Sequence, residues 1–316
     1  METRVSIDAR VLRRYSEGEA LAFVDSVLGP PESWSPSLIA YRLSSDFQAD
    51  WKCEVGNWLL LARDCGFLSR LVHRTGRARH EASNPAVTGP NDSAHRILAQ
   101  ELAPAMVAHY FLGQGWRFVD WEPSTPGGDV DVRLQTPSGL AVDIQVKAPD
   151  QPGELVAGRI VGGEKDDRVL RAIDKAMTQL KTSSAPARIV AVSPQRTWSI
   201  QADVLACHLL GTAVSRTDDI WGICRDGAGT FGSVPGSGVS AVVDLDLIRG
   251  LEATLYRCTV ICNPWVVPGG VMGAECFPHA RVLSLRGDTF VWEPEEPNRC
   301  FRFPTGMRCL TPAAGV

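Results

Sequence analysis

The feature that most constrains the fold is an alternation of polar and apolar residues on both sides of a short turn, between Gly127 and Pro149. A period of two is that of a β-strand, and the turn-forming residues 136–139 separate the two runs, so the stretch predicts a β-hairpin. Side chains alternate across a strand, so one face packs through valine and isoleucine and the other is polar. The polar positions are Asp129, Asp131, Arg133, Asp143, Gln145 and Lys147.

The two polar sets share one face only if the connecting loop holds an odd number of residues or a bulge. Asp131 then lies opposite Asp143 or Gln145, with cross-strand Cβ distances of roughly 5 Å. At that distance a carboxylate, an amide and Lys147 can gather around one divalent ion. Oxygen-only ligands favour magnesium or manganese over zinc. The alternative is an ordinary surface hairpin with a solvated charged face.

An aspartate, a short turn and a strand reading Gln145-x-Lys147 resemble the PD-(D/E)XK nuclease superfamily. The likeness is to the variant with glutamine in place of the usual acidic residue, as in Mrr-like restriction endonucleases. The motif covers about twenty residues and, with its flanking elements, about a hundred. The resemblance implies a mixed β-sheet flanked by helices, and a metal-dependent endonuclease that acts on DNA in restriction or another form of defence.

The resemblance also implies roles for individual residues. Asp131 and Gln145 would hold Mg²⁺ or Mn²⁺, and Asp129, Asp143 or Glu101 would supply the charge that Gln145 lacks; which of the three does so is open. Glu101 is a candidate because the helix before the hairpin often supplies an acidic residue in this family.

By the same resemblance, Lys147 orients or deprotonates the attacking water and offsets charge at the phosphate. Hydrolysis of a phosphodiester requires an anion to be neutralised and hydroxide to form near neutral pH, and a divalent metal with a nearby lysine can supply both.

Composition is compatible with one large domain or two modest ones. The chain has 316 residues, 44% hydrophobic and 22% charged, with a net charge of −4. This balance argues against a polybasic nucleic-acid binder but leaves room for local basic stripes. No apolar run is long enough to span a membrane, and nine cysteines without a secretory leader predict a cytoplasmic protein with reduced thiols.

A zinc site at Cys258, Cys262, Cys276 and His279 is not expected. The first two cysteines flank a strand-like Thr-Val-Ile, and four residues of strand span ~13 Å, too far for two ligands of one ion.

Residues 1–90 are predicted to form a helical N-terminal region and a basic linker. One helix is expected from Ile7 to Leu28, and a clearer one from Asp46 to Cys65 that ends at Gly66. A basic run then leads into a loop and would be either a flexible arm on a phosphate backbone or a solvated connector. Its members are Arg70, His73, Arg74, Arg77, Arg79 and His80.

Residues 91–200 are predicted to form the nuclease-like core. A helix capped by Asp92 or Ser93 runs toward Gly113, with Glu101 at the edge of its apolar side and Pro104 as a kink or a restart. A second helix, from Asp166 to Lys181, has the buried stripe Leu170, Ile173, Met177 and Leu180. Its opposite side carries Arg168, Arg171 and Lys175, which would face solvent or bind nucleic acid.

Residues 201–316 are predicted to be a β-rich C-terminal extension, whose strands either extend the sheet or form a small subdomain. The expected fold class is therefore α/β, with a restriction-endonuclease-like mixed sheet. Two other functions stay open, a catalytically inactive nucleic-acid-binding or scaffolding subunit and an RNA-directed nuclease. A homodimer or a partner protein bound through the N-terminal or C-terminal region also stays open.

Overall fold

The structure is a computed structural model, and it describes most of the chain. The described residues are 15–35, 37–45, 49–83, 93–125, 128–149, 164–193, 202–211, 213–214, 221–222, 229–233, 238–249, 254–266, 269–286 and 289–293. The predicted helix from Ile7 to Leu28 is corrected at its start, because α2 (Glu17–Leu28) begins after Ser16, whose side chain caps the helix and accepts from the Glu19 N–H. The residues before Tyr15 lie outside the described ranges.

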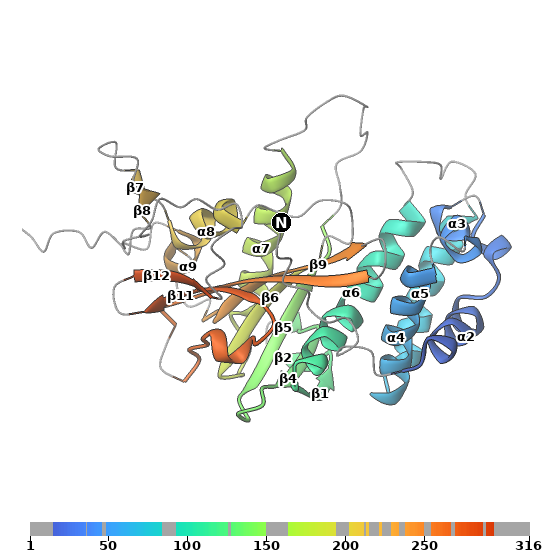
Figure 1. Ribbon diagram of the computed structural model, residues 1–316, viewed down its shortest axis with the longest axis horizontal. Helices are drawn as coiled ribbons and strands as arrows, with labels where there is room; N and C mark the ends of the chain where they lie inside the picture. Colours follow the sequence, from blue (N-terminus) through green and yellow to red (C-terminus); the bar gives the residue numbers. More distant parts are fainter. Residues whose placement is uncertain are drawn as a thin grey trace, which may run out of the picture.

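Eight strands of the described residues form one mixed sheet in the order β1-β4-β5-β6-β9-β10-β11-β12 (Figure 1). The pairs β5 with β6, β6 with β9 and β10 with β11 are parallel, and the other neighbours are antiparallel. Their bounds are β1 (Arg117–Trp121), β4 (Val132–Gln135), β5 (Ala141–Lys147), β6 (Ala187–Val192), β9 (Ala241–Arg249), β10 (Thr254–Cys262), β11 (Arg281–Arg286) and β12 (Thr289–Glu293). Two short pairs stand apart, β2 (Ser124–Thr125) with β3 (Gly128–Asp129) and β7 (Ala213–Val214) with β8 (Trp221–Gly222).

The predicted hairpin is β4 and β5, inside the sheet. Gln135 pairs with Ala141, so the connecting loop comprises the five residues 136–140 and is odd, as predicted. Gly139 in this loop has a φ of 92°, a left-handed conformation that glycine adopts without steric cost. Arg133 pairs with Asp143, so the same register extended by two residues puts Asp131 opposite Gln145.

Helices cover both faces of the sheet. The N-terminal helices are α2, η1 (Pro31–Trp34), α3 (Leu38–Ser44), α4 (Ala49–Asp64), α5 (Leu68–Ala82) and α6 (Ser93–Gly113). α6 contacts β1, β4 and β5 as well as α4 and α5, so it lies between this part of the sheet and these two helices (Figure 1). The opposite face packs on α7 (Glu164–Leu180) and α8 (Ala202–Leu210), and the short α9 (Thr230–Ser233) contacts α8.

Two hydrophobic cores follow from this layering. Val142, Ile144 and Val146 of β5 belong to the larger core, shared with the N-terminal helices. Val190 and Val192 of β6 belong to the smaller core beneath α7 and α8.

The helix α7 packs on β5 and β6 through the predicted stripe, in which Ile173, Met177 and Leu180 are fully buried and Leu170 is partly buried. α6 runs without interruption through Pro104. Both helices of the predicted core therefore flank the hairpin.

The N-terminal helices share the core of the sheet. Trp58 of α4 donates from Nε1 to the hydroxyl of Tyr256 on β10 at 2.7 Å, and that hydroxyl donates to Glu54 at 3.2 Å. α2 approaches α4 so closely that a Cβ at Gly56 would lie 2.1 Å from the Ala20 carbonyl oxygen. The predicted helix from Asp46 to Cys65 corresponds to α4, and Gly66 follows its end with a left-handed φ of 79°.

One expectation is corrected. The basic run at residues 70–80 is not a flexible connector, because it lies on α5, whose Leu71, Thr75 and Ala78 are buried. Of the two alternatives for the C-terminal strands, β9 to β12 follow the first, because they extend the same sheet. A search of the described helices finds none that combines the length and the apolar character needed to cross a membrane.

Candidate active site

The candidate site lies where β4 and β5 separate. The chain bends at Asp131, just before β4, so the backbone N–H of Val146 donates to the Asp131 Oδ2 atom at 2.6 Å. The Nε2 atom of Gln145 donates to the same oxygen. Both bonds fall on Oδ2, and neither uses Oδ1.

Two groups of this pair, the Gln145 amide oxygen and the Asp131 carboxylate, would be stabilised by a bound cation. Gln145 is almost fully buried, and its Oε1 atom has no hydrogen-bond partner. Burial raises the pKa of the Asp131 carboxyl from 3.8 to about 6, although the Val146 N–H and the Lys147 cation oppose the shift. A buried polar atom without a partner costs free energy. A cation bound by these oxygens would reduce that cost at Gln145 and would also stabilise the ionised form of Asp131.

Lys147 ends β5 beside Asp131 and is half-buried. Its pKa is lowered by burial and by the nearby Lys175 of α7, while the Asp131 carboxylate acts in the opposite direction. A lowered pKa increases the fraction of neutral amine, the form that can accept a proton.

Two acidic side chains and an arginine adjoin Asp131 from the side of α5 and α6. Arg74 of α5 forms an ion pair with Glu122, and its Nε atom lies 3.9 Å from a carboxylate oxygen of Glu101 on α6. Glu122 and Arg74 both act on the Asp131 pKa, the first raising it and the second lowering it. Glu101 therefore joins the cluster through Arg74, and burial raises its own pKa.

Local backbone geometry brings Glu122 to this place. Glu122 follows β1 with a φ of 52°, a left-handed conformation that costs a non-glycine residue on the order of 1 kcal/mol. Its N–H donates to the Asp131 carbonyl oxygen at 3.1 Å, which ties the end of β1 to the start of β4. The preceding Trp121 stacks on Phe67, with ring centroids 3.8 Å apart, and so fixes the start of α5 against β1.

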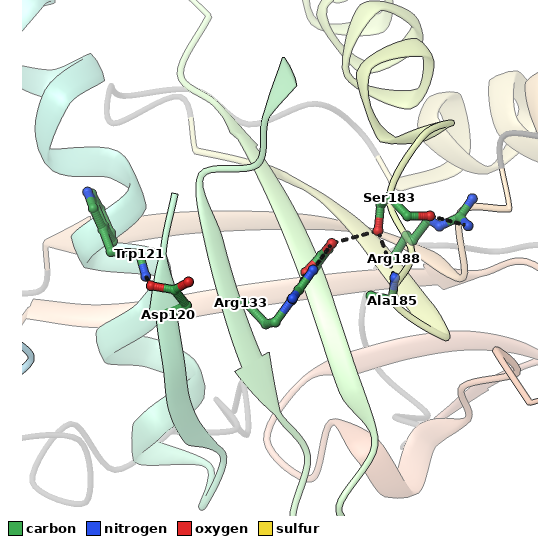
Figure 2. A network of polar contacts seen from close by, with 7 residues as sticks. Asp120, Trp121, Arg133, Ser183, Ala185 and Arg188 are labelled. Atoms are coloured by element: carbon green, nitrogen blue, oxygen red, sulfur yellow. Dashed lines mark hydrogen bonds and ion pairs between the residues drawn. The ribbon is translucent and has the colours of Figure 1, made fainter. Parts of the chain in front are cut away.

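Asp143, the other predicted metal ligand on β5, has partners different from those of Asp131. Arg133 donates to its Oδ1 atom at 2.5 Å and to its Oδ2 atom at 2.9 Å, and Ser183 donates to Oδ2 at 2.6 Å. Arg188 in turn donates to the Ser183 carbonyl at 2.7 Å, and Figure 2 shows this chain of contacts. Because the buried carboxylate is occupied by a bidentate arginine and a hydroxyl, its role here is to join β4, β5 and the end of α7.

The other predicted site residues lie on β3 and α7. Asp129 lies in β3, but its side chain is outside the described part. Arg168, Arg171 and Lys175 are exposed on α7, and Lys175 is close enough to affect Lys147. The structure thus brings together Asp131, Gln145 and Lys147, adds Glu101 and Lys175 at the margin, and separates Asp143.

Arg74 and Glu122 are the members of this site that sequence reasoning missed. The signal for Arg74 was present, because Arg70, His73, Arg74 and Arg77 follow helical spacing of three and four. Nothing in the residue pattern predicts the left-handed turn at Glu122.

The residues present fit a hard divalent cation in part. Among the described side chains, no three of His, Cys, Asp and Glu converge where they could hold a metal ion. Asp131 and the unpartnered Gln145 Oε1 offer two oxygen donors, and magnesium keeps several waters when it binds through one or two protein ligands. Such a site would be completed by water and a substrate phosphate.

Comparison with known proteins adds little. No family model and no curated protein matches the chain. The chain is similar to a solved structure of Pyrococcus furiosus SfsA in complex with Ca²⁺, at 11% identity and a TM-score of 0.23. The match covers 50% of this chain and 60% of SfsA, so it spans less than two thirds of that protein, and at this TM-score it carries no argument.

Proposed function

We propose that the protein is a metal-dependent nuclease that hydrolyses phosphodiester bonds in DNA. The observation that carries the proposal is the convergence of Asp131, an unpartnered amide oxygen of Gln145 and a half-buried Lys147 at one end of the hairpin. The resemblance of these positions to the PD-(D/E)XK motif supports the same reading.

Each residue has a definite task in this proposal. Asp131 and Gln145 would hold Mg²⁺ or Mn²⁺, which supplies positive charge against the phosphate and acidifies a water. The Val146 N–H fixes the Asp131 carboxylate at 2.6 Å, so its orientation is set before any ligand binds. Lys147, with its lowered pKa, either accepts the proton of the attacking water as a neutral amine or stabilises the developing phosphate charge as a cation.

A second candidate is a nucleic-acid-binding subunit without turnover. The observation in its favour is that Arg74 already pairs with Glu101 and Glu122, so the chain neutralises two of the acids at the site by itself. In this case the neutral Gln145, together with the paired Glu101 and Glu122, would leave the site with too little negative charge to bind a metal ion.

One assay separates the candidates. Purified protein is incubated with plasmid, single-stranded DNA and RNA, in magnesium, manganese or a chelator. We expect metal-dependent cleavage of DNA by the wild type. Cleavage should be lost in Asp131→Ala, which removes a ligand, and in Lys147→Ala, which should still bind metal.

Gln145→Glu is the sharper variant, because it adds a negative charge where an oxygen already lies. Metal affinity should rise, and cleavage should persist or improve. A wild type that is inactive with every metal, beside an active Gln145→Glu, would favour the binding subunit. Undiminished cleavage by Lys147→Ala would overturn the assigned site, and preferential cleavage of RNA would replace DNA as the substrate.

A further inference from the structure

We propose that one face of α5 is a binding surface for the phosphate backbone of a nucleic acid, and that it leads the strand into the candidate active site. The inference rests on the proposed function and deepens it. The α5 basic face consists of Arg70, His73, Arg74 and Arg77.

The first argument is placement along the helix. These residues are spaced by three, one and three positions, so they form a single stripe on the surface of α5. Arg70, His73 and Arg77 are exposed, and the segment Leu68 to His80 contains no acidic residue to neutralise them. The opposite side of the helix packs on α6 through Leu71, Thr75 and Ala78.

The second argument is shape. The surface has a shallow depression of about 290 Å³, lined by Ser69, Arg70, His73 and Arg74. All four side chains can donate hydrogen bonds, and Arg70 and Arg74 are permanent cations, the combination that binds phosphate. The depression is therefore an anion-binding surface by its chemistry.

The third argument is the connection to the candidate site. Arg74 contributes to the depression and also pairs with Glu122 and Glu101 beside Asp131. Arg77 lies close enough to lower the pKa of Glu101. A phosphate in the depression would compete with the two carboxylates for Arg74, so a contact of Arg74 within the candidate site can be exchanged for a contact with substrate.

The fourth argument is rigidity. The stacked pair Phe67 and Trp121 joins the start of α5 to the end of β1, one residue before Glu122. Arg79 anchors the other end of the helix by donating to the Leu28 carbonyl at 2.7 Å and covering the Trp34 ring. Both ends of α5 are thus held, and the spacing between the basic face and Asp131 is built into the fold.

A nucleic acid fits this surface better than a membrane does. Interfacial membrane helices expose a large apolar face next to their cations. In the described part of α5, Val72 is the one exposed large hydrophobic residue, and the apolar side is buried against α6.

The test is the salt dependence of DNA binding by the full chain, measured by anisotropy on a fluorescent duplex with a chelator present. The variant Arg70→Ala/Arg77→Ala is compared with the matched control Arg63→Ala/Arg117→Ala. The control removes two exposed arginines from α4 and from the end of β1 that lies away from Glu122. Thermal unfolding checks that both variants fold.

Each phosphate contact contributes about 0.9 to the slope of log K against log salt, or about tenfold in affinity at 0.1 M salt. We expect this negative slope to become shallower by about 1.8 in the α5 variant and to stay unchanged in the control. Equal slopes in the two variants would overturn the inference. Binding to anionic phosphatidylserine vesicles that depends on Arg70 and Arg77, with DNA binding unaffected, would overturn it in favour of a membrane surface.

The outcomes also separate this inference from the proposed function. A wild type that cleaves DNA while the α5 variant keeps its slope contradicts the α5 surface alone. A wild type that binds DNA through α5 but cleaves nothing with any metal contradicts the nuclease alone.

Discussion

Asp131 and Asp143 have the same side chain on the same hairpin, yet their surroundings give them opposite roles. Asp143 is fully buried and satisfied by Arg133 and Ser183. Asp131 is partly buried and accepts hydrogen bonds from an amide and a backbone N–H, and desolvation raises its pKa to about 6. The Asp143 carboxylate stabilises the fold, whereas ionisation of the Asp131 carboxylate lowers the free energy of unfolding.

Substitution of the two aspartates should separate stability from activity. Asp143→Ala leaves Arg133 without its partner and should cost about 3 kcal/mol of unfolding free energy, with cleavage per folded molecule retained. Asp131→Asn keeps an acceptor for Val146 and Gln145 but removes a charge. Because the folded-state pKa lies above the ordinary value, ionisation of Asp131 destabilises the fold as the pH rises from about 4 to 6.

At pH 8 Asp131→Asn should therefore be as stable as the wild type or more so, and inactive. Urea unfolding and single-turnover cleavage measure the two properties. A large loss of stability in Asp131→Asn would contradict the assignment of Asp131 to the active site. An Asp143→Ala variant that is stable but inactive would contradict the structural role of Asp143.

At the scale of elements, α5 and α7 each bring a cation to the candidate site. Arg74 acts on Asp131 from α5, and Lys175 of α7 acts on Lys147. Asp131 and Glu122 lie at the ends of strands, and the two helices supply positive charge around them. A polyanion that approaches this end of the hairpin would therefore contact both helices.

Removal of the α7 cations should weaken nucleic-acid binding without regard to base sequence. In the triple variant Arg168→Ala/Arg171→Ala/Lys175→Ala, the negative slope of log K against log salt should become shallower by about 2.7 if each side chain meets one phosphate. The matched control is Arg63→Ala/Arg117→Ala/Arg286→Ala, in which three exposed cations elsewhere are removed. An unchanged slope in the α7 variant would show that these three side chains face solvent and do not contact nucleic acid.

The hairpin and both core helices could be predicted because their patterns are local. The alternation of residues 129–147 and the stripe on α7 each follow from the geometry of one element. The roles of Asp143 and Arg74 could not be predicted in this way, because they depend on partners from other elements. Arg133 and Ser183 decide the role of Asp143, and the pairing of Arg74 depends on where α5 meets β1.

At the scale of the whole molecule, the predicted division into three regions does not correspond to three cores. The larger core includes Leu61 of α4, Leu102 of α6 and Val260 of β10. The sheet continues from the hairpin through β12 without a break in its order. The stability of the sheet is therefore a property of the entire described fold.

The pH dependence of global stability should report a carboxylate in the middle of this sheet. Asp244 on β9 is buried, and burial together with the neighbouring Asp246 raises its pKa from 3.8 to about 7, although Arg257 acts in the opposite direction. The raised folded-state pKa means that stability is highest below about pH 4 for this group and is lost as the pH rises through 7. The upper limit of the loss is about 4 kcal/mol.

Asp244→Asn should remove this loss, so the variant should gain stability over the wild type at pH 8 and show little difference at pH 4. Urea unfolding at a series of pH values measures the effect. A wild-type profile that Asp244→Asn leaves unchanged would show that Asp244 titrates near its ordinary value.

The bond from Trp58 to Tyr256 has a consequence for how the chain is made. A ribosome releases α4 long before β10, because 198 residues separate the two partners. Until β10 emerges, α4 can already pack on α2, α5 and α6, but Glu54 and Trp58 lack the hydroxyl that joins them to the sheet. A nascent chain halted before Tyr256 would therefore leave these two side chains without the strand that covers them in the folded protein, and so accessible to chaperones and proteases.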